Sequence, residues 1–179
     1  MSRLKGFTAY DSVSPTMSMA PALQLLCKEH AKLRKGMEDV WEFAGKASSR
    51  DTEFVMEWLV RERKLRQAWE LHTGKEERVL LGALSKYVDS DRGPLAVMKY
   101  EHELMENLFD KLEEDMNRLA KAPDNEALYQ EVMQQFRNAC QIKGNHCYKE
   151  ENSTFSLAQS LLSESEKVLI LQLIRKMKH

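Results

Sequence analysis

The residues in this sequence that could do chemistry are histidines followed by a glutamate four positions later. His72, His102 and His146 each have such a glutamate, whereas a fourth internal histidine, His30, has none. In an α-helix a spacing of four places both side chains on one face, one turn apart. Each pair can therefore offer an imidazole nitrogen and a carboxylate oxygen to the same metal ion. The candidate metal ligands are His30, His72, Glu76, His102, Glu106, His146 and Glu150.

A purely structural role for these side chains is the alternative to a metal site. A single histidine on the apolar face of a helix is more often a hydrogen-bonded core residue than a ligand. Glutamate at i+4 is also common on exposed helix faces. However, four buried imidazoles beside three buried carboxylates would be costly to desolvate without a compensating charge. The set therefore predicts a metal site in which Glu76 and Glu150 each bridge two ions. Imidazole and carboxylate together suit iron, manganese or zinc.

Hydrophobic periodicity predicts the four long helices that must position these residues. Apolar side chains recur at i, i+3, i+4 and i+7, and each of the four histidines is in phase with the apolar stripe of its own helix. Proline is favoured in a first helical turn, and aspartate is a common N-cap. The expected boundary signals are Pro21, the stretch GKASSR, Asp51, the loop DSDRGP with Pro94, the turn at Pro123 and Asp124, and Leu162.

The fold class that follows is all-α, an antiparallel up-down-up-down four-helix bundle. Only seven glycines and four prolines occur, which favours long helices over a many-stranded sheet. We expect an irregular N-terminal arm over 1–20, the bundle over 21–162 and a short fifth helix over 163–179 packed on the bundle. Ser163 and Glu166 form its expected capping box. Its VLILQLI run is apolar nearly all round, so we expect it to be covered on most sides.

The heights of the ligands can be checked by counting from the turns. His102 lies 21 residues before Pro123 and His146 lies 23 after it, so the two are nearly level. His72 lies 16 residues before Val88, whereas His102 lies only eight after Pro94. The loop 89–93 is therefore expected to run along the bundle.

Composition and charge argue against several function classes. Lys and Arg total 27 and Asp and Glu 28, and a net charge of −1 argues against a broad nucleic-acid surface. No apolar run approaches the roughly 20 residues that span a bilayer, so no membrane partner is expected. The start of the chain has basic residues but no apolar h-region, unlike a secretion signal. Three cysteines, an odd number, then indicate free thiols and a cytoplasmic location.

Four motifs taken in order give the sequence a family resemblance. They are KEHAKLRKGM, HTGKEERVLL, GPLAVMKYEHELMENL and HCYKEEN, and together they resemble the hemerythrin-like, HHE cation-binding family over roughly 21–162. The resemblance implies a four-helix bundle with a non-haem di-iron site bridged by two carboxylates. By this resemblance, His30 and His72 would bind one iron, and His102 and His146 would bind the other. Glu76 and Glu150 would bridge the two irons.

The sequence also departs from the oxygen carriers of that family. They have His-x-x-x-His on the third helix, where this chain has His102 and Glu106. They place an aspartate five residues after the histidine of the fourth helix, where this chain has Glu150 four residues after His146. A site richer in carboxylates favours ferric iron, because hard anionic oxygens stabilise the higher charge. The departures therefore argue against long-lived reversible oxygen carriage.

Three functions stay open on the sequence. The first is a di-iron protein that binds oxygen, nitric oxide or a related small ligand, or that senses or buffers iron and oxidative stress. Its open coordination position is expected on the iron of His30 and His72, which would have fewer protein ligands. The alternatives are an iron-dependent stress enzyme, acting in peroxide or nitric oxide turnover or iron–sulfur cluster repair, and a metal-stabilised interaction module. Manganese or zinc could substitute for iron, and the oligomeric state is open, a dimer included.

Overall fold

The computed structural model describes residues 19–46 and 50–177, and these residues form helices joined by short connections. Those two ranges contain no β-strand, so the all-α prediction is confirmed for them. The arm predicted for 1–20 lies almost entirely outside the described residues. The elements in chain order are α1 (Pro21–Gly45), α2 (Thr52–Lys75), η1 (Glu76–Leu81), α3 (Gly82–Leu84), α4 (Gly93–Lys121), α5 (Glu126–Lys149), η2 (Glu150–Thr154), α6 (Phe155–Leu161) and α7 (Glu164–Lys176), of which η1 and η2 are π-helical.

The predicted signals at the helix ends are confirmed. Pro21 is the first residue of α1. The Asp51 side chain accepts a hydrogen bond of 2.8 Å from the backbone N–H of Phe54 at the start of α2. Ser163 and Glu166 form the capping box of α7. These side chains bind backbone N–H groups that have no partner within the helix, which is why the sequence signals locate the helix starts.

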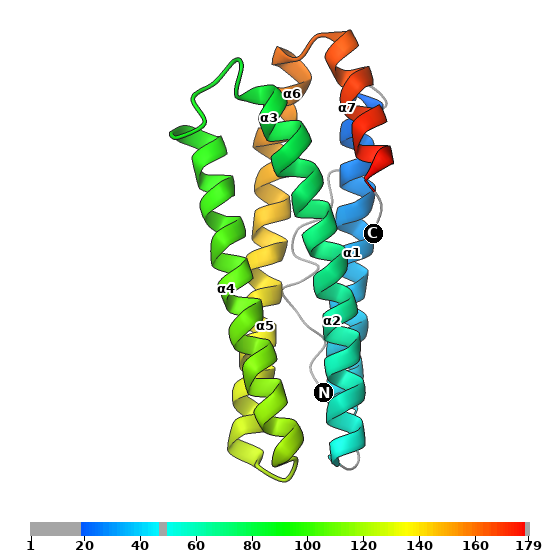
Figure 1. The fold of residues 1–179 in the computed structure, drawn as a ribbon, viewed down its shortest axis with the longest axis vertical. Helices are drawn as coiled ribbons and strands as arrows, with labels where there is room; N and C mark the ends of the chain where they lie inside the picture. The colour runs from blue at the N-terminus through cyan, green and yellow to red at the C-terminus, as the bar shows by residue number, and fades with distance from the viewer. Residues whose placement is uncertain (1–18, 47–49, 178–179) are drawn as a thin grey trace.

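The four long helices α1, α2, α4 and α5 lie side by side, as Figure 1 shows. α2 packs against α1 and α4, and α5 packs against α4 and α1. These contacts close a ring around one interior. The described residues therefore form a helical bundle in which side chains from four helices can reach a common centre.

The predicted second and fourth helices are not continuous α-helices. α2 passes into η1 at Glu76, and α5 passes into η2 at Glu150. Each π-helical segment thus begins at the carboxylate of an H-x-x-x-E pair. π-Helical turns are rare and occur frequently at functional sites. The third pair lies on α4, which is α-helical throughout.

The connection from α3 to α4 brings the two halves of the bundle into register. Figure 1 shows that the chain rises past α3 after Leu84 and then returns downward to the start of α4. Gly93 has a φ of +67°, a left-handed conformation that glycine adopts without a steric cost. The chain runs back along the bundle here, as counting from the turns requires.

Two hydrophobic clusters fill the interior, one on each side of a polar layer. One cluster contains Trp58 and the other contains Phe155. Each long helix, together with the segment that continues it, contributes to both clusters, and its histidine lies near the change from one cluster to the other. On α4, for example, His102 follows Met98 of one cluster and precedes Phe109 of the other. The histidines therefore share one level, although hydrophobic side chains surround them above and below.

The fifth helix of the prediction, α7, is covered less than expected. It packs on α1 and η1, and Ile170 and Ile174 are buried there. Val168 and Leu169 are 55% and 53% exposed, and Leu173 is 40% exposed. The expectation that α7 is covered on most sides is therefore wrong. Only one face of α7 packs on the bundle, so the apolar side chains on its other faces stay exposed.

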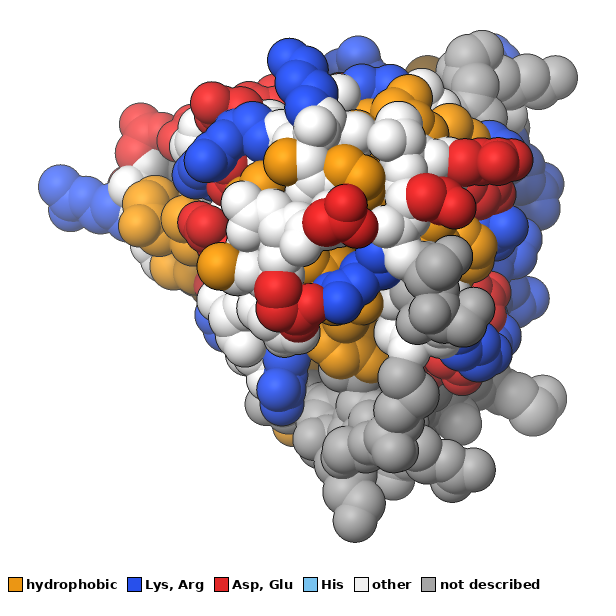
Figure 2. All heavy atoms as spheres, turned by 90° about the horizontal axis from the view of Figure 1, so that it is seen from below, with side chains coloured by type: hydrophobic (Ala, Val, Ile, Leu, Met, Phe, Trp, Pro, Cys, Tyr) orange, Lys and Arg blue, Asp and Glu red, His pale blue; other side chains and the backbone are white. Residues whose placement is uncertain are grey.

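The outer surface carries charges of both signs. Figure 2 shows the end of the bundle opposite α7, where acidic and basic side chains are interspersed around apolar ones. Neither sign dominates that face, in agreement with a net charge of −1. Among the described helices, none combines the length and the apolar character that a bilayer crossing demands.

Candidate metal centre

Six of the seven predicted ligands meet in the polar layer between the two clusters. They form two overlapping groups, in each of which one ligand atom per residue lies within 4.8 Å of the others. Glu76 and Glu150 belong to both groups. The groups are His30, His72, Glu76 and Glu150, and Glu76, His102, His146 and Glu150. All six residues are buried, with His102 the most exposed at 6%.

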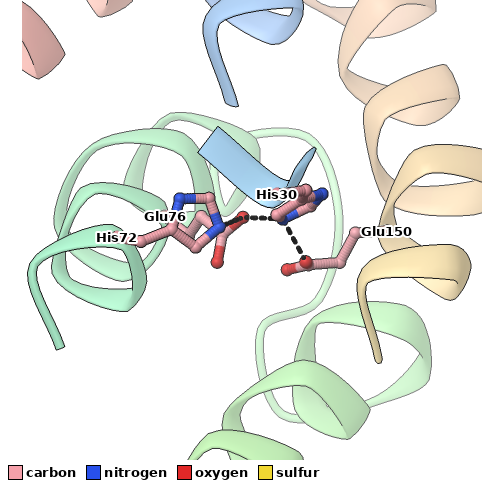
Figure 3. Close-up of side chains that lie close together, drawn as sticks. All are labelled: His30, His72, Glu76 and Glu150. Carbon is pink, nitrogen blue, oxygen red and sulfur yellow. Dashed lines mark ion pairs between the residues drawn. The ribbon is translucent and has the colours of Figure 1, made fainter. Parts of the chain in front are cut away.

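The two shared carboxylates each direct one oxygen toward each group. Oε1 of Glu76 lies 3.0 Å from Nε2 of His72, and its Oε2 lies 3.7 Å from Nε2 of His102. Glu150 is arranged in the same way, because its Oε2 lies 3.2 Å from Nε2 of His30 and its Oε1 lies 3.2 Å from Nε2 of His146. Figure 3 shows Glu76 between His72 and His30, with Glu150 approaching from the opposite helix. This is the arrangement that two carboxylates bridging two ions require.

Glu106 is the predicted ligand that the structure does not bring to the centre. It belongs to neither group and is exposed. In a regular α-helix four residues advance about 400°, so Glu106 lies about 40° around α4 from His102. Its side chain lines the mouth of a cavity beside His102 instead. The geometry gives no support to a ligand role for Glu106.

A second layer of four glutamates, here called the outer carboxylates, binds the far nitrogens of the histidines. Each Nδ1 atom lies within 3 Å of one outer carboxylate oxygen, and each contact joins two different helices. The contacts are His72 with Glu29 at 2.9 Å, His30 with Glu151 at 2.8 Å, His102 with Glu77 at 2.7 Å and His146 with Glu101 at 2.9 Å. Carboxylates in this position fix the ring orientation and the tautomer of a metal-binding histidine.

Three of the four outer carboxylates are paired with a cation. The pairs are Glu29 with Lys75 at 2.6 Å, Glu151 with Arg34 at 3.2 Å, and Glu101 with Lys149. Glu77 differs from them. Within the described ranges no lysine or arginine lies within ion-pair distance of Glu77, and its side chain is 42% exposed. The corner of the centre at His102 and Glu77 is therefore the least enclosed.

The outer carboxylates were not predicted from the sequence, although the sequence contains a pattern that marks them. Each one is the chain neighbour of an inner residue: EH occurs at 29–30 and 101–102, and EE occurs at 76–77 and 150–151. The order E-H, then H-x-x-x-E-E, thus occurs once over 29–77 and once over 101–151. A glutamate next to a ligand points to the neighbouring helix, where it reaches that helix's histidine. The sequence could have identified these residues by that repeated order.

The inner atoms of the six residues fit metal cations because they lack partners of their own. In a neutral ring whose Nδ1–H donates to an outer carboxylate, Nε2 presents a lone pair to the centre. The Nε2 atoms of His102 and His146 lie 2.9 Å apart, and two lone pairs at that distance repel unless a proton or a cation lies between them. Among the described residues, the buried atoms without a hydrogen-bond partner include Nε2 of His30 and His72 and both oxygens of Glu76 and Glu150. Cations would satisfy all of these atoms together.

The carboxylates of this centre favour protonated imidazoles. Burial disfavours the charged imidazolium, but the carboxylates of Glu150 and Glu101 raise the pKa of His146 to about 10. Burial also opposes ionisation of Glu76, yet the charge of His72 holds the pKa of Glu76 well below its usual value. Metal ions would therefore have to displace protons from the imidazoles, so metal affinity should weaken as the pH is lowered.

A cavity of about 520 Å³ reaches the centre from one side. Of the six inner residues only His102 lines it, together with Glu77, Trp69, Phe109 and others. From the sequence we expected the open coordination position on the iron of His30 and His72, because that iron would have fewer protein ligands. The structure brings two imidazoles and both shared carboxylates to each half, so the ligand count does not distinguish them. The accessible side is the one at His102.

Comparison with known proteins identifies one family. Residues 22–158 match the hemerythrin HHE cation binding domain. The match covers all six inner residues, the four outer carboxylates and both π-helical segments. No curated protein and no solved structure matches the chain.

Proposed function

The chain belongs to the hemerythrin HHE cation-binding domain family, and we propose that it is a non-haem di-iron protein that binds a small ligand. The six inner residues would hold the ions, His30 and His72 on one side and His102 and His146 on the other. The observation that supports two ions is the position of Glu76 and Glu150, each with one oxygen toward either histidine pair. A single ion would leave one oxygen of each carboxylate and two imidazoles without a partner.

Iron is the proposed cation because of the ligand chemistry. Neutral imidazole and carboxylate suit iron, and they also suit manganese and zinc, which could replace it. The two shared carboxylates are the only anions in the inner set of six. Because no second histidine on α4 joins His102, the share of hard carboxylate oxygens is higher than in the oxygen carriers, which favours the ferric state and supports a sensor or buffer of iron and oxidative stress rather than a long-lived oxygen carrier.

The ligand in this proposal is oxygen, nitric oxide or a related small molecule. Bound iron would supply an open coordination position and one-electron redox chemistry. The chain's own contribution is to hold the four imidazoles in one tautomer through the outer carboxylates, and to keep the centre between two hydrophobic clusters. Phe155 stacks on His30 at 5.6 Å between ring centroids, which helps to exclude water from that half. We place the protein in the cytoplasm on its free thiols, Cys27, Cys140 and Cys147.

The proposal includes an antiparallel up-down-up-down order of the long helices. Its support is the order of the two clusters along the chain. α1 runs from the cluster of Phe155 toward that of Trp58, and α2 continued by η1 runs in the reverse sense. α4 and then α5 continued by α6 repeat this alternation. Four histidines at one level require such an order when the connections are short.

Spectra of iron-loaded protein test the small-ligand role. The protein would be loaded with ferrous iron without oxygen, and then exposed separately to oxygen and to nitric oxide. We expect a new visible absorption band with each gas. An iron-loaded protein whose spectrum responds to neither gas would contradict the small-ligand function and leave only a structural role for the metal.

A further inference from the structure

One corner of the metal centre differs from the other three. At His102 the outer carboxylate is Glu77, which in the described part of the chain has no cation within ion-pair distance. The cavity of about 520 Å³ meets the centre at the same corner, and both His102 and Glu77 line it. A molecule that approaches the centre through this cavity therefore meets His102 first.

Lys143 places a positive charge at the inner end of this cavity. Lys143 is buried, at 3% exposed, and it lies one turn before His146 on α5. Its Nζ atom lies 4.1 Å from the centroid of the Trp69 ring, which also lines the cavity. Among the described residues no carboxylate lies within ion-pair distance of this ammonium. The buried Lys75 provides the contrast, because it pairs with Glu29 at 2.6 Å.

A buried ammonium without a carboxylate partner is costly, and a cation–π contact offsets only part of that cost. Burial lowers the pKa of the Lys143 ammonium, and the negative charges of Glu76 and Glu150 at the metal centre and of Glu77 at the cavity wall act against that effect. Two ions of charge two or three would more than neutralise the two carboxylates of the centre. Lys143 would then face a positive centre across the cavity, and an anion between them would be attracted by both.

We propose that the cavity at His102 is a binding site for a small monovalent anion, held by Nζ of Lys143 against the Trp69 ring. The inference rests on the proposed di-iron centre, because the ions supply the second part of the positive field. It adds to the proposed small-ligand function a charge-selecting residue, Lys143, which lies outside the six inner residues, and the anions that would fit have two or three heavy atoms, such as azide, nitrite or superoxide.

The mouth of the cavity does not supply this selectivity. Lys99, Glu103 and Glu106 line it, and all three are exposed. Their opposite charges are screened by solvent and counterions. Lys143 is the buried cation of the cavity, so the preference for an anion depends on this residue.

Azide binding to iron-loaded protein tests the proposal. The dissociation constant of azide would be measured by absorption for the wild type, for Lys143→Met and for Lys99→Met, with iron content determined for each. Methionine keeps the length and apolar stem of lysine and removes its charge. A charge-assisted contact is worth a factor of about 10 to 100 in affinity, so Lys143→Met should bind azide at least about 10-fold more weakly. Lys99→Met, which removes the same charge from the exposed mouth, should change the constant by less than about 2-fold.

Nitric oxide binding to the reduced protein is the matched ligand control. Because nitric oxide is neutral, its affinity should be unchanged in Lys143→Met. Wild-type affinity for azide in a Lys143→Met protein with full iron content would overturn the anion site, and so would an iron-loaded wild type that binds no azide. Both results leave the di-iron proposal intact, whereas a wild type that takes up no iron would refute that proposal first.

Crystals of the iron-loaded wild type provide a test that needs no variant. After a soak in sodium bromide, anomalous scattering should place a bromide ion within about 3.5 Å of Nζ of Lys143. An empty cavity beside Lys143, with bromide found elsewhere on the surface or not at all, would contradict the proposal. The result holds even if Lys143→Met fails to fold.

Discussion

Among the described residues, two regions of the interior bury carboxylates that have no hydrogen-bond partner, and the pKa of these carboxylates shifts in opposite directions in the two regions. Glu76 and Glu150 lie in the metal centre, and Glu62 lies on α2 toward the cluster of Trp58; all three are 0% exposed and have no hydrogen-bond partner among the described residues. The charge of His72 holds the pKa of Glu76 well below its usual value. Burial raises the pKa of Glu62 to about 7.

The difference comes from what surrounds each carboxylate. The oxygens of Glu76 and Glu150 face four imidazoles, each fixed by an outer carboxylate on its far side. Glu62 faces no imidazole, and its charge only raises the pKa of the neighbouring Cys140 further. A buried carboxylate by itself is therefore no sign of a metal site. The sign is the convergence of imidazoles and carboxylates whose free atoms point to the same space.

Replacing the carboxylates with amides should give the largest effect. Glu76→Gln or Glu150→Gln removes a negative oxygen that faces both histidine pairs, whereas Glu62→Gln removes an equally buried carboxylate that faces none. Loss of a partner outside the ligand shell weakens metal binding by about 10- to 100-fold, so loss of a shared ligand should exceed about 100-fold. Iron titration of the three variants checks this.

Glu106→Gln belongs in the same experiment as a second control. Its carboxylate is exposed and outside both groups, so this variant should retain iron like Glu62→Gln. Equal iron loss in Glu62→Gln and Glu150→Gln would remove the distinction between the two buried regions.

The stability of metal-free protein is the next comparison. Ions that bind ligands from several helices stabilise only the folded state, by about 3 kcal/mol at a free concentration 100 times the dissociation constant. For a chain of this size that raises the melting temperature by roughly 5 to 10 °C. The gain should shrink between neutral pH and about pH 5, because the imidazoles must lose protons before metal binds. Thermal melts by circular dichroism, with and without iron, measure both effects; equal melting temperatures at neutral pH would contradict a coupled site.

Glu62 predicts a pH dependence of its own. Its pKa in the folded protein, about 7, lies above the ordinary value of 4.5, so its protonated form is favoured by folding. The stability it contributes is fully present below about pH 4.5 and is lost as the pH rises through 7. Glu62→Gln, which resembles the protonated form, should therefore be more stable than the wild type by about 2 to 3 kcal/mol at pH 8 and equal to it near pH 4.

Urea unfolding of metal-free protein at the two pH values measures that difference. Comparison of two proteins under identical conditions cancels the titration of the histidines. A constant difference between pH 4 and pH 8 would mean that Glu62 does not change its protonation in this range.

The smallest expected effects come from the outer carboxylates. Glu29→Gln keeps a hydrogen-bond acceptor for His72 but removes a charge and leaves Lys75 unpaired, and it should weaken iron binding by about 10-fold. Glu77→Gln acts at the exposed corner and leaves no lysine or arginine unpaired among the described residues, so its effect on iron binding should be smaller. Iron affinities of the two variants decide this; a larger effect for Glu77→Gln would mean that enclosure by cations does not matter to the histidines.

The sequence predicted the helices and six inner residues because both depend on regular spacing. An apolar stripe locates a helix, and a spacing of four places His72 with Glu76 and His146 with Glu150 in any α-helix. Capping signals at Asp51 and Ser163 are equally local, so they too were predicted correctly.

What the sequence did not predict depends on contacts between helices. The same spacing failed at Glu106, because that position on α4 is exposed and lines the cavity rather than the centre. The outer carboxylates were missed because each acts on a histidine of another helix, and single-helix periodicity does not represent such contacts. The exposure of Val168 on α7 likewise depends on how much of the bundle surface is available to that helix.

Metal analysis of protein purified from iron-replete cells tests the central claim most directly. Two ions bridged by Glu76 and Glu150 require about two irons per chain, together with the near-ultraviolet absorption of bridged ferric iron. The measurement needs no variant and no added ligand. A stoichiometry of two with that absorption is the result predicted here; a reproducible value of one, or no iron after anaerobic loading, would contradict the dinuclear centre.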